Sequence, residues 1–440
     1  MDFSIPDTTT DISSTQQNYT LYNIHINGIH HCSLRYSQLF TFNEELHRLL
    51  PNVMVQIALF PPKKFFNLGP KDTDERRVLL EHYLQSIAQN KYIISSSYFN
   101  EYFLVAQRET FSRQLNDNSN GKINLKMTLL NQHELIVENV SISDNTTRVL
   151  DACASKIQVA QDLMAHFALY LYTKNKEQLH ILRPLYDLES PYFSLEQTKK
   201  IHAQACIVLK KSYWDVDVDL KLINDRRARN LLFIQAEYEM QQSESFYAND
   251  IYRQLEALRE NNSFKDYVLL ARTSRFYGHI FLRQCSILYP VDDSSKQKLS
   301  QCLLALGNNE IVCCFNIEEK KNINEIVFKV IRIRCWKITR TRQETSIAIE
   351  YLIKKEKLQW ITIHTEQAAL VSMCLQSMVD EILTKRKGSV VTTTTTVATK
   401  PKEPSANSTR VGNGLATRRE SDVERLNNIA FDRGVDDDDL

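Results

Sequence analysis

The spacing of apolar residues changes several times along this chain of 440 residues, and each change marks a different kind of local structure. Alternating apolar residues in 22–26 indicate a strand, whereas 72–89 has an apolar residue every three or four positions, as a helix does. The block 217–277 is helical, and 302–363 returns to short β-branched runs before a last helical stretch over 365–386. This pattern predicts an α+β protein of several domains.

Finer elements follow from the same spacing. Residues 1–17 are polar and are expected to be loosely held, and the polar stretch 114–121 indicates the first domain boundary. Further predicted elements are a helix over 98–107, strands over 123–129, 135–140, 167–172 and 179–182, a helix capped by Asn145 or Thr146, helical segments over 220–240, 247–259 and 264–277, and strands over 302–306, 310–317, 326–339, 347–351 and 358–363.

Composition excludes several classes of function. The net charge of +1 provides no global field for a nucleic acid, so none is expected as a partner. Only nine glycines occur, without a GxGxxG or GxxxxGK(S/T) loop, which argues against glycine-loop nucleotide enzymes, and no cofactor is expected. We find no nucleophile–base pair and no paired carboxylates at a recognisable spacing. The sequence therefore predicts a binding protein rather than an enzyme.

Cysteine usage and hydropathy indicate the compartment. The nine cysteines are odd in number and form no CxxC, which argues against a disulfide framework and a zinc site. His30 and His31 have no further metal ligand at a suitable spacing, so no metal is expected. The N-terminus lacks the pattern of a signal peptide, and no apolar run is long enough to span a bilayer. We therefore expect a cytosolic protein with peripheral membrane contact.

Basic and aromatic residues gather in three nearby segments. Arg35-Tyr36-Ser37 stands where a strand gives way to a helix, 60–66 combines prolines, lysines and phenylalanines, and Arg76-Arg77 lies on the next helix. A guanidinium fork suits a phosphate bidentately, and an aromatic ring can lie flat against a sugar-like ring. The plain interpretation is a solvated basic surface with a loop tucked onto the core. It suffices for Arg35 alone, but not for the full set in this order.

The order of these motifs resembles the PX domain, a phosphoinositide-binding module, over residues 1–110. The resemblance implies that the module binds phosphatidylinositol 3-phosphate. The implied roles are Arg35 on the 3-phosphate with Ser37 in support, Tyr36 stacked on the inositol ring, Lys63 on the phosphodiester and Arg76 on the ring hydroxyls, with Lys64 and Arg77 as lower-ranked alternatives. The residues expected to insert into the membrane are Phe65, Phe66 and Leu68.

The blocks that follow have the order of a FERM module. They are expected to form a ubiquitin-like or Ras-associating-like first lobe over 115–210, a helical second lobe over 215–278 and a PH- or PTB-like third lobe over 279–387. Residues 388–440 are low in apolar content and are expected to be a disordered tail. The chain resembles the PX-FERM subgroup of sorting nexins in the stretches 210–214, 334–336, 358–363, 369–381 and 428–440.

A PH-like fold leaves a groove between one sheet edge and its last helix, where an extended peptide can add as a strand. Trp336 lies on the predicted edge strand and Val379 on the predicted helix. The plain interpretation is that both are core residues. The resemblance implies instead that they form the floor of a pocket for Asn-Pro-x-Tyr or Asn-x-x-Tyr motifs in the tails of receptors and integrins.

The chain ends in four aspartates and Leu440. The plain interpretation is a solubilising acidic tail. The resemblance implies a docking motif for the Retriever recycling complex, carried by Phe431, Asp439 and Leu440. Asn428-x-x-Phe431 also imitates the cargo motif, and so we hypothesise that the tail can occupy the protein's own groove.

Together, the residues and the resemblance predict a non-enzymatic endosomal sorting adaptor, in the cytoplasm and on the cytoplasmic face of early endosomes. Such a protein recycles transmembrane cargo to the plasma membrane, away from lysosomal degradation. The first lobe resembles Ras-associating folds, but no residue set predicts a small GTPase as a partner. The rival interpretation is a FERM-type membrane–cytoskeleton linker. The tail disfavours it because it offers no basic amphipathic helix for actin.

Overall fold

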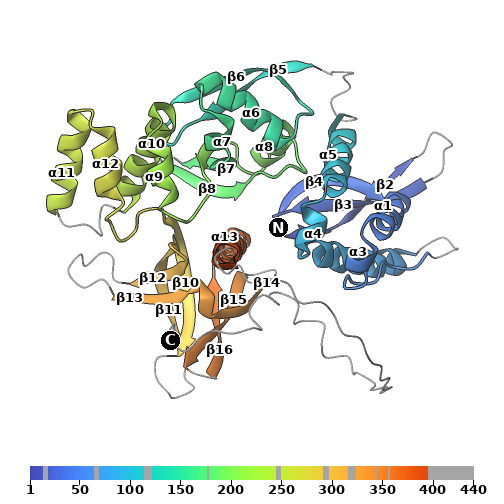
Figure 1. Ribbon diagram of the computed structural model, residues 1–440. Coiled ribbons are helices and arrows are strands. Elements are labelled where there is room, and N and C mark those ends of the chain that lie inside the picture. Colours follow the sequence, from blue (N-terminus) through green and yellow to red (C-terminus); the bar gives the residue numbers. More distant parts are fainter. Residues whose placement is uncertain are drawn as a thin grey trace, which may run out of the picture. The chain divides into compact units, whose positions relative to one another are not determined.

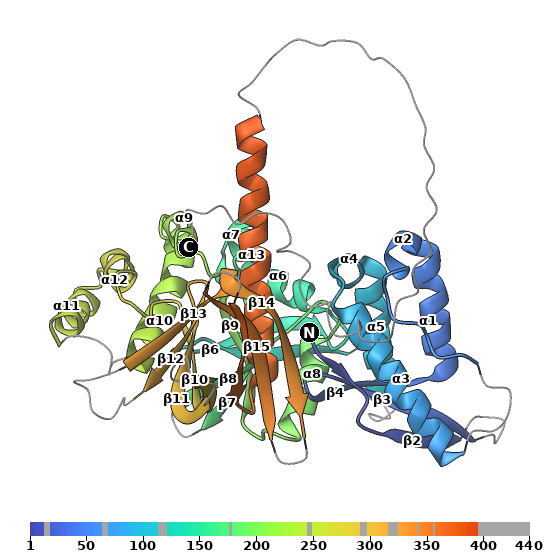
Figure 2. The same cartoon turned by 90° about the horizontal axis from the view of Figure 1, so that it is seen from below.

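The computed structural model describes residues 1–12, 18–63, 69–112, 121–175, 178–243, 249–290, 297–315, 324–341, 344–354 and 357–394. The chain separates into two compact units, Met1–Ile280 and Phe281–Leu440. Figure 1 labels the helices and strands of both units, and Figure 2 shows the same elements from below. Helices and strands are mixed in both units, which confirms the predicted α+β fold class.

The N-terminal domain (residues 1–112) is a small antiparallel sheet covered by helices. Its strands are β1 (Phe3–Ser4), β2 (Thr8–Ile12), β3 (Asn18–Ile26) and β4 (Ile29–Arg35), and β3 pairs with each of the others. Asn27 and Gly28 have positive φ angles and make the tight turn between β3 and β4. The helices are α1 (Tyr36–Leu49), α2 (Pro51–Met54), α3 (Pro70–Ala88), α4 (Lys91–Ile94) and α5 (Ser97–Ser112), of which α3 and α5 confirm the two helices predicted there.

The N-terminal segment is held firmly, and the expectation of a loose segment is wrong for its described part. Phe3 and Ile5 are fully buried in the core of the domain. The Ile5 amide donates a hydrogen bond to the Glu81 carboxylate on α3, at 2.7 Å. Two apolar residues among polar neighbours produce no periodic pattern, so the sequence did not reveal these strands. Residues 13–17 lie outside the described residues.

The first lobe is a five-stranded sheet in the order β6-β5-β9-β7-β8. Its strands are β5 (Lys122–Thr128), β6 (Glu134–Ser141), β7 (Phe167–Asn175), β8 (Gln178–Pro184) and β9 (Ala205–Lys211), and its helices are α6 (Thr146–Ile157), α7 (Gln161–Met164) and α8 (Pro191–Lys199). The parallel pair β5 and β9 at its centre is the arrangement expected of a ubiquitin-like lobe. Asn145 caps α6 by accepting the Arg148 amide hydrogen at 3.0 Å, as predicted. The sequence did not predict β9 or α8.

The second lobe consists of the helices α9 (Val218–Leu222), α10 (Arg226–Gln242), α11 (Asn249–Glu260) and α12 (Phe264–Ala271). The single helix predicted over 220–240 is wrong because the chain breaks between α9 and α10. Asp225 accepts hydrogen bonds from the amides of Arg227 and Ala228, and this cap starts a new helix.

A connector of residues 185–190 joins β8 to α8 and packs into the N-terminal domain. Leu188 is fully buried within that domain's core. Beside it, the Arg183 guanidinium and the Glu189 carboxylate form a two-pronged ion pair with both contacts at 2.7 Å, and neither side chain is more than 4% exposed. Gln107 on α5 donates to the Ser194 hydroxyl, which itself donates to Glu189. The N-terminal domain and the first lobe therefore share a buried polar and apolar junction.

The third lobe is a seven-stranded sheet in the order β13-β12-β11-β10-β16-β15-β14, packed against one long helix. Its elements are β10 (Ile280–Pro290), β11 (Gln297–Gly307), β12 (Glu310–Phe315), β13 (Asn324–Lys329), β14 (Ile333–Arg340), β15 (Thr345–Lys354), β16 (Lys357–His364) and α13 (Ala368–Thr394). The continuous strand predicted over 326–339 is wrong. A 3₁₀ turn, η3 (Val330–Arg332), buries Val330 and divides it, so β13 and β14 lie at opposite ends of the sheet.

Candidate functional site

The first segment of the candidate site is the transition from β4 to α1. Arg35 is the last residue of β4 and Tyr36 the first of α1. The Arg35 amide donates to the Gln38 side-chain oxygen at 2.9 Å, which fixes the start of the helix. An arginine and an aromatic ring therefore stand side by side at a helix N-terminus, as predicted, and a helix N-terminus favours negative charge.

The Arg35 guanidinium lies over an aromatic ring that sequence reasoning missed. Its central carbon is 3.2 Å from the centroid of the Tyr19 ring on β3. Tyr19 lies two residues before Leu21, whose register partner on β4 is Arg35, so the contact depends on how β3 and β4 pair. Pairing across strands cannot be deduced from one strand alone.

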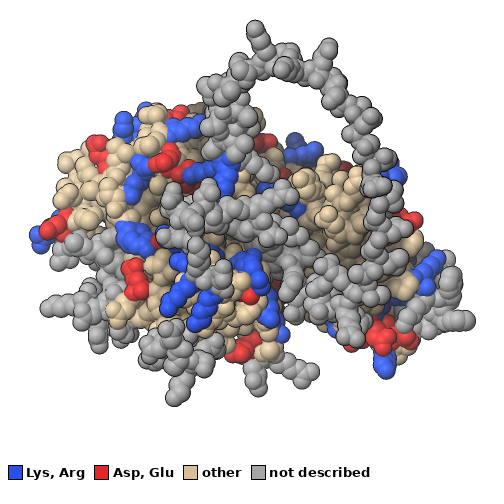
Figure 3. All heavy atoms as spheres, turned by 60° about the horizontal axis from the view of Figure 1, so that its bottom comes forward, with Lys and Arg blue, Asp and Glu red and all other residues tan. Residues whose placement is uncertain are grey.

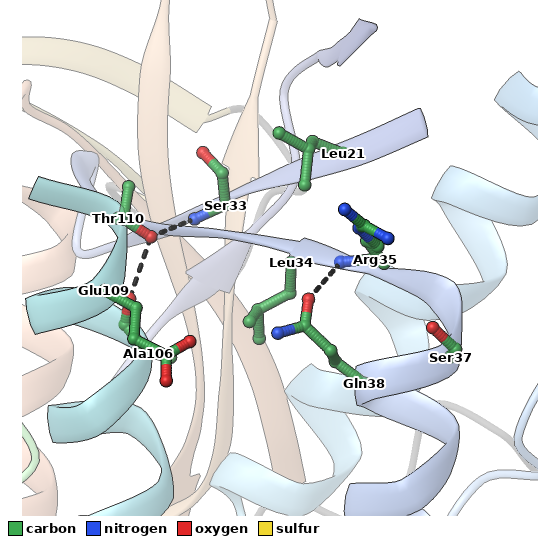
Figure 4. A pocket seen from close by; sticks show the side chains of 9 residues that line it. All are labelled: Leu21, Ser33, Leu34, Arg35, Ser37, Gln38, Ala106, Glu109 and Thr110. Atoms are coloured by element: carbon green, nitrogen blue, oxygen red, sulfur yellow. Dashed lines mark hydrogen bonds between the residues drawn. The ribbon is translucent and has the colours of Figure 1, made fainter. Parts of the chain in front are cut away.

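A pocket of about 210 Å³ adjoins Arg35 (Figure 4). Arg35 and Ser37 line it from β4 and α1, while Glu109 and Thr110 line it from α5. The Glu109 carboxylate would repel a phosphate in this space. The arrangement therefore favours a phosphate on the part of the segment nearer Tyr36 and Arg76.

Tyr36 and Arg76 are in direct contact. The Arg76 guanidinium carbon is 4.3 Å from the centroid of the Tyr36 ring, and the Tyr36 hydroxyl donates to the Pro61 carbonyl at 2.8 Å. Burial raises the pKa of the Tyr36 hydroxyl, and the Arg76 charge opposes that rise. The phenyl ring of Phe60 packs beside Tyr36, with centroids 5.5 Å apart. The proline-containing segment thus orients the ring, and Arg76 occupies one of its faces.

Arg76 is a buried cation whose hydrogen-bonding capacity is only partly used, because it acts on the Tyr22 hydroxyl but not through every nitrogen. Its side chain belongs to a residue only 7% exposed, and its Nη2 has no hydrogen-bond partner among the described residues. Arg77 is different, because its guanidinium pairs with Asp74 at 2.7 Å and donates to the Ile5 carbonyl. The structure therefore gives Arg77 a role within the fold and leaves Arg76 available.

The remaining residues of the predicted lipid site are either exposed or outside the described residues. Ser37 is exposed on α1 and lines the small pocket. Lys63 is exposed at the end of the described segment 18–63. Lys64 and the predicted insertion residues Phe65, Phe66 and Leu68 lie outside the described residues. Among the predicted lipid-binding residues, Tyr36 thus contacts Arg76, and Arg35 and Ser37 line one pocket, while the assigned roles stay predictions.

The second candidate site is formed by β14 and α13, which pack against each other. As predicted, Trp336 lies on the end strand of the sheet and Val379 on the helix. Trp336 is 5% exposed and its indole donates to the Ser372 hydroxyl of α13 at 2.9 Å, while Val379 is 2% exposed. Both residues are therefore core residues of the third lobe in this state. Their contact with a cargo peptide stays a prediction.

We also searched the described residues for metal ligands, membrane-spanning helices and a charged face. They contain no group of three or more His, Cys, Asp or Glu side chains arranged for a metal ion. Within the same residues, no helix has the length and hydropathy needed to cross a membrane. On the face in Figure 3, basic and acidic side chains are interspersed, so no single sign of charge covers it. The tail residues Phe431, Asp439 and Leu440 lie outside the described residues.

Three family models match this chain. They are the PX domain over residues 22–106, the sorting nexin 17/27/31 FERM domain F1 lobe over residues 123–214, and the Sorting Nexin 17 FERM C-terminal domain over residues 278–383. The fold is therefore a PX domain followed by a FERM-like module. This is the class of membrane-associated adaptor that the sequence motifs predicted.

Similarity to whole proteins narrows the class. The chain is 34% identical to sorting nexin-17 of Danio rerio over 407 residues, which covers 88% of this chain and 82% of that one. It is also 34% identical to human sorting nexin-17 over the same length, and 32% identical to human sorting nexin-31 over 400 residues. The chain belongs to the sorting nexin-17 family. It is an endosomal sorting adaptor with a phosphoinositide-binding PX domain and a FERM module for cargo tails.

Proposed function

We propose that this protein binds phosphatidylinositol 3-phosphate on early endosomes through its PX domain and returns transmembrane cargo to the plasma membrane. The observation that carries the proposal is the buried Arg76 guanidinium, which contacts Tyr36 and has no carboxylate partner among the described residues. A buried cation without an anionic partner is costly, and an anionic ligand would compensate for it. Arg35, beside Tyr36, supplies a second fork for the same anion.

The free energies of membrane contacts indicate that lipid selectivity needs a pocket rather than a diffuse basic surface. Each basic side chain near an anionic membrane contributes about 1 kcal/mol, and each inserted Phe or Leu side chain contributes about 1.5–3 kcal/mol at best. Ordering the loop and immobilising the protein offset much of that sum. Such contacts do not distinguish one lipid from another, so the selectivity depends on Arg35 and Arg76.

The proposal includes a peptide site in the third lobe. Strand β14 has one described neighbour, β15, and its other edge can accept an added strand beside α13. The ligands would be Asn-Pro-x-Tyr or Asn-x-x-Tyr motifs. The terminal residues Phe431, Asp439 and Leu440 would recruit the Retriever complex.

The experiment is co-sedimentation of the full chain, wild type and Arg35→Ala, with vesicles that carry each monophosphorylated phosphoinositide in turn. We expect selective sedimentation with phosphatidylinositol 3-phosphate and its loss in the variant, at an unchanged melting temperature. Equal sedimentation with every anionic lipid, insensitive to Arg35→Ala, would contradict the proposal. Co-sedimentation with actin filaments would then favour the linker interpretation.

A further inference from the structure

A row of three side chains crosses the strands beside the candidate phosphate site. Asp11 on β2 is the register partner of Tyr19 on β3. Tyr19 lies two residues before Leu21, which is the register partner of Arg35 on β4. Tyr19 and Arg35 are therefore diagonal neighbours on one face of the sheet, within reach of each other's long side chains.

The contacts along this row are close. The Arg35 guanidinium lies over the Tyr19 ring, 3.2 Å from the centroid, and the Tyr19 hydroxyl donates to Oδ2 of Asp11 at 2.6 Å. The other carboxylate oxygen of Asp11 accepts the amide hydrogen of Ile12 at 2.8 Å. The carboxylate thus holds the ring by its hydroxyl, and the guanidinium lies over the ring that is held in this way.

This arrangement holds a cation without neutralising it. A guanidinium stacked on a ring keeps its five N–H donors at its edge, where they remain available to a phosphate. A carboxylate in the place of the ring would occupy those donors and compete with the ligand. The nearby carboxylate, Asp11, is instead hydrogen-bonded to the tyrosine hydroxyl, and no described carboxylate forms an ion pair with Arg35.

We propose that Tyr19, fixed by Asp11, is a positioning residue that orients Arg35 for an inositol phosphate. The inference rests on the proposed function, because it concerns the same lipid site. Arg35 would otherwise lose rotamer freedom on meeting the phosphate, and pre-orientation reduces that cost of binding. From the usual cost of immobilising one long side chain on binding, removing the ring weakens lipid binding about two- to twelvefold.

The test compares Tyr19→Leu, Tyr19→Phe and Asp11→Asn in the full chain. Tyr92→Leu, which removes a tyrosine that is 75% exposed on α4, is the matched control. Affinity is measured for phosphatidylcholine vesicles that carry phosphatidylinositol 3-phosphate, and separately for its water-soluble headgroup. We expect Tyr19→Leu to weaken both, Tyr19→Phe and Asp11→Asn to cause a smaller loss because the ring remains but its hydrogen bond to a carboxylate is gone, and Tyr92→Leu to have no effect. A loss confined to vesicles would overturn the inference, because it would indicate a membrane contact rather than orientation of Arg35.

A double-mutant cycle separates positioning from a general structural effect. If Tyr19 acts through the planar guanidinium of Arg35, Tyr19→Leu causes a smaller loss in an Arg35→Lys background, which keeps a charge but not the fork, than in the wild type. An equal loss in both backgrounds, or a melting temperature that falls in parallel with affinity, would overturn the inference.

The single variants Arg35→Ala and Tyr19→Leu also distinguish the two proposals. If Arg35→Ala abolishes binding while Tyr19→Leu binds like the wild type, only the positioning role is wrong. If Arg35→Ala itself binds like the wild type, the proposed lipid site is wrong, and the role of Tyr19 is overturned with it.

Discussion

Arg76 and Arg77 follow one another on α3 but have different surroundings. The Arg77 guanidinium is used within the fold, by Asp74 and by the Ile5 carbonyl. The Arg76 guanidinium lies over Tyr36 and keeps a buried Nη2 without a hydrogen-bond partner among the described residues. Adjacent positions on a helix face directions about 100° apart, so two identical side chains meet different partners.

This difference predicts opposite effects of two matched substitutions. Arg76→Ala should abolish selective binding to vesicles with phosphatidylinositol 3-phosphate, because it removes the buried cation. Arg77→Ala should retain that binding and lower the free energy of unfolding by about 1 kcal/mol, since its ion pair is partly exposed. Vesicle co-sedimentation and thermal melts measure the two effects. Equal loss of lipid binding in both variants would contradict the assignment.

His31 makes the stability of the PX domain depend on pH. Its Nε2 contacts the Phe103 carbonyl at 3.1 Å, and burial lowers the pKa of the ring from 6.5 to about 4, although the Glu189 carboxylate opposes this. Between these two pH values the unfolded chain binds a proton at His31 that the folded chain does not. The folded state is therefore fully favoured above pH 6.5 and loses stability as the pH falls toward 4.

His31→Gln should reduce this dependence. Each titrating group of this kind contributes up to about 1.4 kcal/mol per pH unit to the slope of the unfolding free energy. We expect denaturant unfolding between pH 7 and pH 5 to show a shallower slope in His31→Gln than in the wild type. His133→Gln, which changes an exposed side chain, is the control. A slope that is unchanged by His31→Gln would show that this histidine does not contribute.

Among the elements of the third lobe, α13 decides whether the proposed peptide site beside β14 can be tested. Trp336 and Val379 are almost fully buried, so substituting a charge for Val379 would unfold the lobe and would not test peptide binding. Ser372 contacts Trp336, and Gln376, one turn further along α13, is exposed near the same face. Gln376 is therefore a better position from which to block the groove.

Gln376→Trp should weaken capture of an Asn-Pro-x-Tyr peptide on the order of tenfold or more, because a bulky ring would occupy the path of an added strand. Ser377→Trp is the matched control, since Ser377 is also exposed but lies about 100° further round the helix. Fluorescence anisotropy with a labelled peptide measures the affinity, and melts verify the fold. Equal effects of the two variants would exclude this groove.

The sequence predicted elements well where apolar residues are periodic and poorly where tertiary contacts decide. Arg35 and Tyr36 were located correctly because a strand pattern changes to a helix pattern between them. Tyr19 was missed because its contact comes from strand register. The break at η3 was missed because Val330 is apolar like its neighbours, so the period gave no interruption.

The PX domain and the first lobe are joined through the connector of residues 185–190. Burial opposes ionisation of Glu189, but the Arg183 guanidinium outweighs it and holds the pKa of the Glu189 carboxyl below its usual range. The ion pair therefore persists at neutral pH inside the junction. Residues 185–190 contact both the N-terminal domain and the first lobe, so the two parts are not separated by a simple break in the chain. The predicted domain boundaries at 110 and 115 remain predictions.

Glu189→Ala should destabilise the unit Met1–Ile280 by about 3–5 kcal/mol, because it leaves the buried Arg183 charge without a partner. Glu196→Ala, which removes an exposed ion pair with Lys199, should cost no more than about 1 kcal/mol. Differential scanning calorimetry of the full chain measures both. A loss in Glu189→Ala that does not exceed the loss in Glu196→Ala would show that the junction adds little stability.

The connector also has a mechanical consequence. In the proposed function, the PX domain holds the bilayer while the third lobe holds cargo, so any force between the two would act on the parts that join them. Because Leu188 is embedded in the core of the PX domain, a pull on the lipid anchor passes into the first lobe through packed side chains. The PX domain and the first lobe would therefore share such a force through packed side chains, rather than pass it along an extended linker.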